Sequence, residues 1–210
     1  SMLMDKIIVV SNHAKYGFSK TSYQATNNRT GETINDFRCK TPVDVVNYAV
    51  RDVSAKKVDL DLEYDFNYLV VAQWSPRKNI ENTIGWFLQE FEKEEVGLVL
   101  KTNKANNSIM DKVWTRRDLD SLLKQFPDRK CKVYLVHGDM EEEEICGLYE
   151  NPKIKALINI AHGEGFGLPM FEAAQRGLPV IAPSWGGQVD FLYAMTEEKR
   201  KKGKKPKVYN

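Results

Sequence analysis

One segment of the chain combines a glycine-rich turn with two carboxylates. It reads HGEGFGLPMFEAAQRGLPVIAP, with Glu164 before the turn and Glu172 after it. Gly165 and Gly167 permit backbone angles and close approaches that other residues forbid. Pro169 suits the first turn of a helix, because the N–H that proline lacks has no partner there in any case. The remaining N–H groups of such a helix start, together with the positive end of its dipole, predict a phosphate site.

The two glutamates need an explanation, because a carboxylate beside a phosphate is repelled by it. Glu164 follows an apolar run that is typical of a strand, and ligands of open α/β sheets bind at the carboxyl ends of strands. We therefore expect Glu164 and Glu172 to accept hydrogen bonds from hydroxyl groups on either side of a diphosphate. Ribose hydroxyls on one side and sugar hydroxyls on the other predict a nucleotide sugar lying across the turn. The alternative is structural, since a glutamate in a first helical turn also complements the helix dipole.

Elements that alternate along the chain must position these residues. Five continuous apolar runs have the composition of short buried strands, at residues 66–72, 96–102, 131–137, 154–161 and 179–183. Between them, residues 79–94 and 115–126 carry apolar side chains at helical spacing, and residues 141–150 begin with acidic residues that suit a helix start. Strands alternating with helices at this interval predict a doubly wound, parallel α/β sheet of the Rossmann-like type.

The first 60 residues follow a different pattern. KIIVVSNH, residues 6–13, predicts a strand that ends near His13, and TPVDVVNYAV, residues 41–50, predicts another. Between them, residues 19–38 are polar and include NNRTGET, which indicates a turn or a mobile loop. A lone histidine such as His13 is more often structural than functional.

Length and composition predict one main globular domain. The chain has 210 residues, of which 42% are hydrophobic and 29% charged, and no apolar run approaches the length of a membrane span. The first apolar run is too short for a signal peptide, so we expect a cytoplasmic protein. The three cysteines have neither disulfide nor zinc-site spacing and are expected to be reduced.

Charge is concentrated at the end of the chain. KRKKGKKPK, residues 199–207, holds seven basic residues, whereas the rest of the chain carries more acidic than basic side chains. We expect a solvated basic tail over residues 196–210 that is able to contact a membrane surface peripherally. Nucleic acid is a less favoured partner.

The motifs together resemble a known family. EGFGLPMFE matches the two glutamates, separated by seven residues, of retaining glycosyltransferases with the GT-B architecture (group 1, family 4-like), which have two facing Rossmann-like domains. AAQRGLPVIAPSWGGQVDFL continues the match. Upstream, DFNYLVVAQWSPRKNIENTIGWF is similar to the family's first strand, its basic phosphate-binding loop and the next helix. The resemblance extends from about Asp65 to Leu192 and implies the C-terminal, donor-binding half of such an enzyme.

The resemblance implies a role for each matching residue. Glu172 would bind the ribose hydroxyls, and Glu164 would contact the transferred sugar near the reacting centre. Lys78, with Arg77, would neutralise the leaving diphosphate as the glycosidic bond breaks. The donor-binding set also contains Gly165, Phe166, Gly167 and Leu168 in the turn, and His137 and Gly138 as contacts to the base. The family generally works without a metal, so neither a metal nor another cofactor is expected.

Two departures from the family pattern limit these expectations. The family usually has an arginine shortly after its first strand, where this chain has Gln73. The acceptor half is also barely represented. We expect a remnant of it with the crossover at residues 1–64, the donor-binding domain at residues 65–195, and the basic tail beyond.

The expected activity is the transfer of a hexose from a UDP- or GDP-sugar, with retention, to a glycan, lipid or protein acceptor. Because the acceptor side is so short, we expect the chain to need a separate or missing acceptor domain for catalysis. A non-catalytic nucleotide-sugar binding or interaction module is the main alternative, and a GT-B sugar phosphorylase is a less favoured one.

Overall fold

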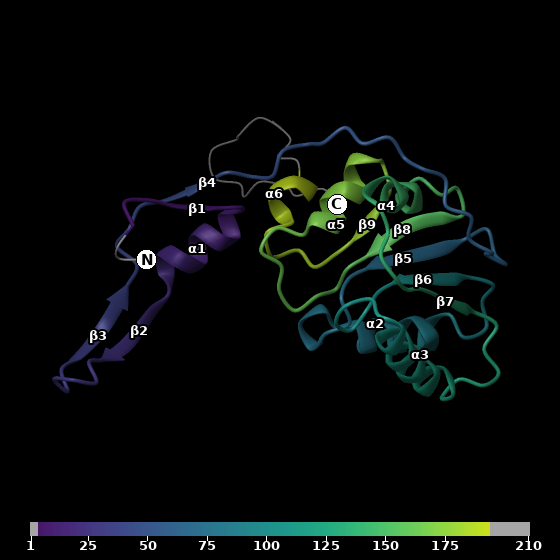
Figure 1. Cartoon of the computed structure of the whole chain (residues 1–210), viewed down its shortest axis with the longest axis horizontal. Coiled ribbons are helices and arrows are strands. Elements are labelled where there is room, and N and C mark those ends of the chain that lie inside the picture. Colours follow the sequence, from purple (N-terminus) through teal and green to yellow (C-terminus); the bar gives the residue numbers. More distant parts are fainter. Residues whose placement is uncertain (1–3, 194–210) are drawn as a thin grey trace, which may run out of the picture. The chain divides into compact units, whose positions relative to one another are not determined.

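The computed structural model describes residues 4–193, which form two compact units (Figure 1). Unit 1 contains residues 4–49, Glu164–Gly167 and residues 185–193, and unit 2 contains Val50–Gly163 and Leu168–Ser184. The basic tail predicted at residues 196–210 lies outside the described residues. Within residues 4–193, no helix has the length and apolar composition needed to cross a bilayer.

Unit 2 is built on a five-stranded sheet. Its strands are β5 (Asn67–Val71), β6 (Gly97–Lys101), β7 (Lys132–Val136), β8 (Ile154–Ile158) and β9 (Val180–Ile181). They lie in the order β7-β6-β5-β8-β9, and every neighbouring pair is parallel. The parallel α/β fold predicted from the alternating pattern is therefore confirmed.

Helices cover both faces of this sheet. Helices α2 (Ile80–Glu90) and α3 (Ile109–Leu123) lie against one face, whereas α4 (Glu142–Tyr149) and α5 (Leu168–Gln175) lie against the other (Figure 1). The chain adds β6 and β7 on one side of β5 and then crosses to β8 and β9 on the other. The loops after β5 and β8 thus leave adjacent strands towards opposite faces, which makes this point the topological switch of the sheet.

The core of unit 2 lies between the sheet and helices α2 and α3. Leu98 and Leu100 of β6, Ile84 and Leu88 of α2 and Leu119 of α3 are fully buried in one apolar cluster. The central strands are covered on both faces, which is why their sequences are continuous apolar runs without alternation.

Helix α3 begins at Ile109, earlier than the residues 115–126 that the sequence predicts. Ser108 is the N-cap residue of this helix, and its hydroxyl accepts a hydrogen bond from the Asp111 N–H at 3.2 Å. The first two turns have no apolar periodicity facing the core, because Ile109 is 83% exposed and Asp111 is buried. The predicted boundary was wrong because it relied on that periodicity.

Unit 1 begins with a short parallel strand pair. Strand β1 (Ile7–Val9) pairs with β4 (Val43–Val45), and helix α1 (Asn12–Lys20) follows β1. The Ser11 hydroxyl accepts a hydrogen bond from the Ala14 N–H at 3.0 Å and caps this helix. The strand predicted to end near His13 is therefore shorter, and His13 belongs to α1.

The polar segment after α1 is a β-hairpin. Strands β2 (Ser22–Thr26) and β3 (Thr33–Arg38) pair antiparallel, and Gly31 supplies a positive φ of 71° in the connection. The loop predicted for residues 19–38 was wrong except for this turn, because the strands are almost entirely exposed and lack an apolar face to signal them. The described part of unit 1 ends with the short helix α6 (Val189–Leu192).

The buried core gives a direct test of the fold of unit 2. Ile84→Ala should lower its free energy of unfolding by about 2–5 kcal/mol, because the truncation leaves a cavity in a fully buried cluster. Ile109→Ala, at an 83% exposed position, is the matched control and should change stability by less than about 1 kcal/mol. Chemical denaturation of both variants measures the difference, and equal losses would contradict the described core.

Candidate functional site

The basic loop after β5 packs against the segment that follows β8. Residues Pro76–Lys78 form a 3-10 turn (η1). The backbone N–H of His162 donates to the Arg77 carbonyl at 2.8 Å, and the Arg77 guanidinium Nη1 donates to the Gly163 carbonyl at 2.7 Å. The two motifs singled out in the sequence, the basic pair and the start of the glycine-rich turn, thus meet at the topological switch point.

Asn79 fixes the end of this basic loop. It has a left-handed backbone with φ of 58°, and its side chain is almost fully buried. Its amide Nδ2 donates to the Ile160 carbonyl at 3.2 Å, and the Thr83 hydroxyl donates to the Asn79 carbonyl at 2.7 Å. Asparagine tolerates the left-handed region better than most residues, so it can start α2 directly after Lys78. The hydrogen bonds of Asn79 therefore fix the backbone directly after Lys78, the last residue of η1.

Glu172 lies on α5 with a buried hydrogen-bond donor beside it. The Tyr149 hydroxyl, at the end of α4, donates to Glu172 Oε2 at 3.0 Å. Burial raises the pKa of Glu172 above its ordinary value, although the hydrogen bond from Tyr149 opposes the shift. Burial, and then the Glu172 charge, raise the pKa of the Tyr149 hydroxyl, so Tyr149 remains a donor at neutral pH. One oxygen of Glu172 is thereby oriented by the protein.

The rest of the glycine-rich turn, Glu164–Gly167, belongs to unit 1. The Ser11 hydroxyl donates to the Gly165 carbonyl at 2.5 Å, and the Gly187 N–H donates to the Glu164 carbonyl at 2.9 Å. A Cβ at Gly187 would lie 2.0 Å from the Gly165 carbonyl oxygen, so only glycine permits this approach. The backbone of the turn is thus fixed by contacts with Ser11 and Gly187 of the same unit.

An aromatic side chain adds to these contacts. Phe166 is 4% exposed, and its ring centroid lies 5.1 Å from that of Tyr48 and 4.9 Å from that of Phe191. The Phe166 side chain thus packs inside unit 1. Its burial does not use the backbone N–H, which is the group predicted to contact the donor. Gly167 follows with a φ of 96°, a left-handed conformation that favours glycine.

His137 and Gly138 follow β7, two strands away from the switch point. The His137 ring is 1% exposed, and its Nε2 lies 3.8 Å from Asp111 Oδ1. The imidazole is thus buried, and a contact to a base would have to come from the backbone. Gly138 has a φ of 113°, and its carbonyl accepts a hydrogen bond from Lys101 Nζ at 2.5 Å.

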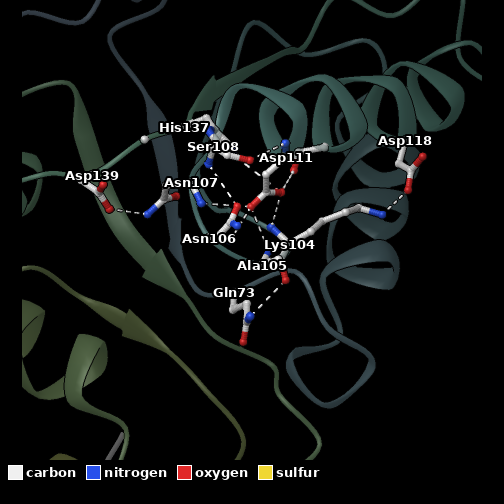
Figure 2. A network of polar contacts seen from close by, with 12 residues as sticks. Gln73, Lys104, Ala105, Asn106, Asn107, Ser108, Asp111, Asp118, His137 and Asp139 are labelled. Atoms are coloured by element: carbon white, nitrogen blue, oxygen red, sulfur yellow. Dashed lines mark hydrogen bonds and ion pairs between the residues drawn. The ribbon is translucent and has the colours of Figure 1, made fainter.

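Polar contacts connect the loops after β5, β6 and β7 (Figure 2). Gln73 stands where the resembled family has arginine, and its Nε2 donates to the Lys104 carbonyl at 3.0 Å. Asp111 lies at the centre of the network, where its carboxylate faces the backbone of the loop after β6 (Figure 2). Gln73 therefore supports the neighbouring loop and supplies no positive charge.

Sequence reasoning missed Asp111 and Tyr149. Ser108 and Asp111 form an S-x-x-D pattern, which is a capping-box signature and could have indicated a helix start there. Tyr149 had no comparable signal, because only the packing of α4 against α5 brings its hydroxyl to Glu172. Among residues 4–193, no group of three or more His, Cys, Asp or Glu side chains is placed to hold a metal ion.

Known proteins are similar to this chain both in sequence and in fold. The relatives that match are serotype-specific mannosyltransferases WbdA of Escherichia coli. One is 29% and another 33% identical over 116 residues, which is 55% of this chain. That match spans only 13% of the length of either relative.

Solved structures show the same fold. The OtsA apo structure superimposes with a TM-score of 0.57 at 9% identity and covers 89% of this chain and 47% of that chain. A Staphylococcus aureus TarM mutant solved with UDP gives a TM-score of 0.52 at 16% identity, with 91% of this chain and 32% of that chain covered. No family model matches the chain.

The raised pKa of Glu172 predicts how stability depends on pH. The folded state holds the Glu172 proton more tightly than the unfolded state, so ionisation lowers stability as pH rises through the ordinary value of 4.5. Glu172→Gln keeps an acceptor for Tyr149 and removes the charge. It should therefore be more stable than the parent at pH 7, with the advantage shrinking below pH 4.5. Thermal unfolding of the parent and the variant at pH 4 and pH 7 measures the difference in stability. A variant that is less stable than the parent at pH 7 would contradict the raised pKa of Glu172.

Proposed function

We propose that this chain is the donor-binding domain of a glycosyltransferase that transfers a hexose from a nucleoside-diphosphate sugar with retention. The proposal depends mainly on one observation, the contact of the basic loop with the start of the glycine-rich turn. The bond from Arg77 Nη1 to the Gly163 carbonyl places a guanidinium at the carboxyl edge of the parallel sheet. Ligands of such sheets bind there, beside the switch point.

Each residue of the proposed site has a separate task. Lys78 and Arg77, together with the N-terminus of α5, would bind the diphosphate, and Glu172 would accept hydrogen bonds from the ribose hydroxyls. Glu164 would contact the sugar. When the glycosidic C–O bond breaks, its electron pair passes to the diphosphate oxygen, so fixed cations stabilise the transition state more than the ground state. The sugar carbon becomes oxocarbenium-like at the same time.

The comparisons suggest which donors to test first. The matched WbdA relatives are named mannosyltransferases, and the TarM structure contains UDP. GDP-mannose and UDP-linked hexoses are therefore the first donors for calorimetry. The acceptor, which can be a glycan, a lipid or a protein, would be bound with the help of an acceptor domain. Donor hydrolysis or transfer by the chain would support an enzyme, and saturable binding without turnover would support a binding module.

Substitution of each glutamate should affect a different part of donor binding. Glu172→Ala should weaken binding of UDP or GDP about tenfold, because it removes a charged acceptor of the ribose hydroxyls. Glu164→Ala should leave binding of the bare nucleotide unchanged and weaken binding of the intact nucleotide sugar. Isothermal titration calorimetry with both ligands measures the pattern. Identical affinities for the parent and both variants would rule out the assigned roles.

Lys78 provides a test of the diphosphate contact. Lys78→Ala should lower the affinity for a nucleoside diphosphate about tenfold or more, because it removes a charge-assisted contact to phosphate. It should have little effect on binding of the nucleoside, which lacks phosphates. Lys112→Ala, on the exposed face of α3, changes the net charge equally and is the matched control. If both variants reduce affinity by the same factor, the effect is one of overall charge and the assigned contact is wrong.

A further inference from the structure

The loop between β6 and α3, residues 102–108, is organised around one buried carboxylate. Asp111 is completely buried, and its Oδ1 accepts a hydrogen bond from the Thr115 hydroxyl at 3.1 Å. The carboxylate also accepts four backbone N–H groups of the loop, from Lys104 at 2.9 Å, Ala105 at 2.9 Å, Asn106 at 2.8 Å and Asn107 at 3.1 Å. Four consecutive residues of an irregular loop thus share a single side chain as their acceptor.

The chemistry of this contact keeps Asp111 charged. Burial by itself raises the pKa of the carboxyl group, but the four N–H groups together hold it well below its ordinary value. A buried carboxylate is costly unless hydrogen bonds of this kind replace water. The loop and the carboxylate therefore depend on each other, because either one alone would have unpaired polar groups in the interior.

The constraint extends from this loop to its neighbours on both sides. Asn107 has a left-handed backbone with φ of 59°, and its Nδ2 donates to Asp139 Oδ1 at 2.6 Å in the loop after β7. On the other side, the Lys104 carbonyl accepts the hydrogen bond from Gln73 after β5. Figure 2 shows Asp111 between these two connections. One carboxylate thus fixes the middle of three adjacent loops at the carboxyl edge of the sheet.

Several buried polar atoms in the same place lack hydrogen-bond partners. Within the described residues they include Thr102 Oγ1, Asn107 Oδ1 and His137 Nε2, from the loops after β6 and β7. Native interiors contain few such atoms, because each one costs free energy. Three such atoms in two neighbouring loops leave hydrogen-bonding capacity at the carboxyl edge of the sheet, which a ligand or water can satisfy.

We propose that Asp111 is a positioning residue, which holds the β6–α3 loop in the conformation that supports nucleotide binding beside His137 and Gly138. This rests on the proposed function, because it assumes that the carboxyl edge binds the donor. Asp111 is buried and does not touch the donor itself. It acts through the loop backbone and through the bond between Asn107 and Asp139.

The test compares two variants of α3 that should be destabilised for different reasons. Asp111→Asn keeps the shape of the side chain but removes the charge that holds the four N–H groups. Leu119→Ala creates a cavity in the core on the same helix and leaves the loop contacts in place. Calorimetry with UDP and GDP, and hydrogen exchange of the amides of residues 104–107, are measured for both variants and the parent.

We expect Asp111→Asn to lower nucleotide affinity at least tenfold and to speed exchange of these four amides relative to other loops. Leu119→Ala should lose stability but retain its affinity to within about twofold. If Asp111→Asn does not fold, Asn107→Gly is the second variant, because glycine accepts the positive φ and removes only the bond to Asp139. It should lower the affinity severalfold.

The outcomes separate this inference from the proposed function. Equal affinity losses in Asp111→Asn and Leu119→Ala, or unchanged affinity in Asp111→Asn or Asn107→Gly, would overturn the positioning role while the parent still binds nucleotide. If the parent binds neither nucleotide nor nucleotide sugar, the proposed function fails and the positioning role fails with it. A selective affinity loss with faster loop exchange supports both.

Discussion

The parallel pairing of β5 with both β6 and β8 determines where this protein can bind a ligand. Because parallel strands place their carboxyl ends at one edge, every loop that carries a candidate residue of unit 2 leaves from that edge. The change of direction between β5 and β8 then brings the basic turn Pro76–Lys78 against His162 and Gly163. His162 and Gly163 lie more than 80 residues from the basic loop in sequence, and the order of the strands in the sheet makes these two segments neighbours.

The same edge holds charges that the protein has partly removed from water. Glu172 is half-buried with a raised pKa, whereas Asp111 is fully buried and has a lowered one. The difference follows from their partners, since Glu172 has the hydroxyl of Tyr149 and Asp111 has four backbone N–H groups. The first arrangement leaves a carboxylate that can exchange hydrogen bonds with a ligand, and the second one fixes a loop. The number of donors that the protein supplies thus separates a carboxylate that keeps acceptor capacity for a ligand from one that is satisfied by its own loop.

The sequence was informative where local pattern and fold agree. Continuous apolar runs identified the five strands of unit 2, and EGFGLPMFE with its basic partner identified the family resemblance and the switch-point motifs. Pattern failed at the hairpin β2–β3, whose strands have no buried face, and at the start of α3, which depends on a cap instead of apolar periodicity. The contact between Tyr149 and Glu172 and the four bonds of Asp111 depend on tertiary packing, so spacing along the chain could not reveal them.

The central claim is that a nucleoside diphosphate sugar binds at the carboxyl edge of the five-stranded sheet. The most direct measurement is a map of backbone amide chemical shifts during titration with GDP-mannose and with UDP-glucose. At saturation, at least one donor should shift most strongly the backbone amides of residues 77–79, 137–138, 165–168 and 170–172. Shifts confined to surfaces away from this edge, such as the exposed face of α3, or no saturable shifts with either donor class, would contradict it.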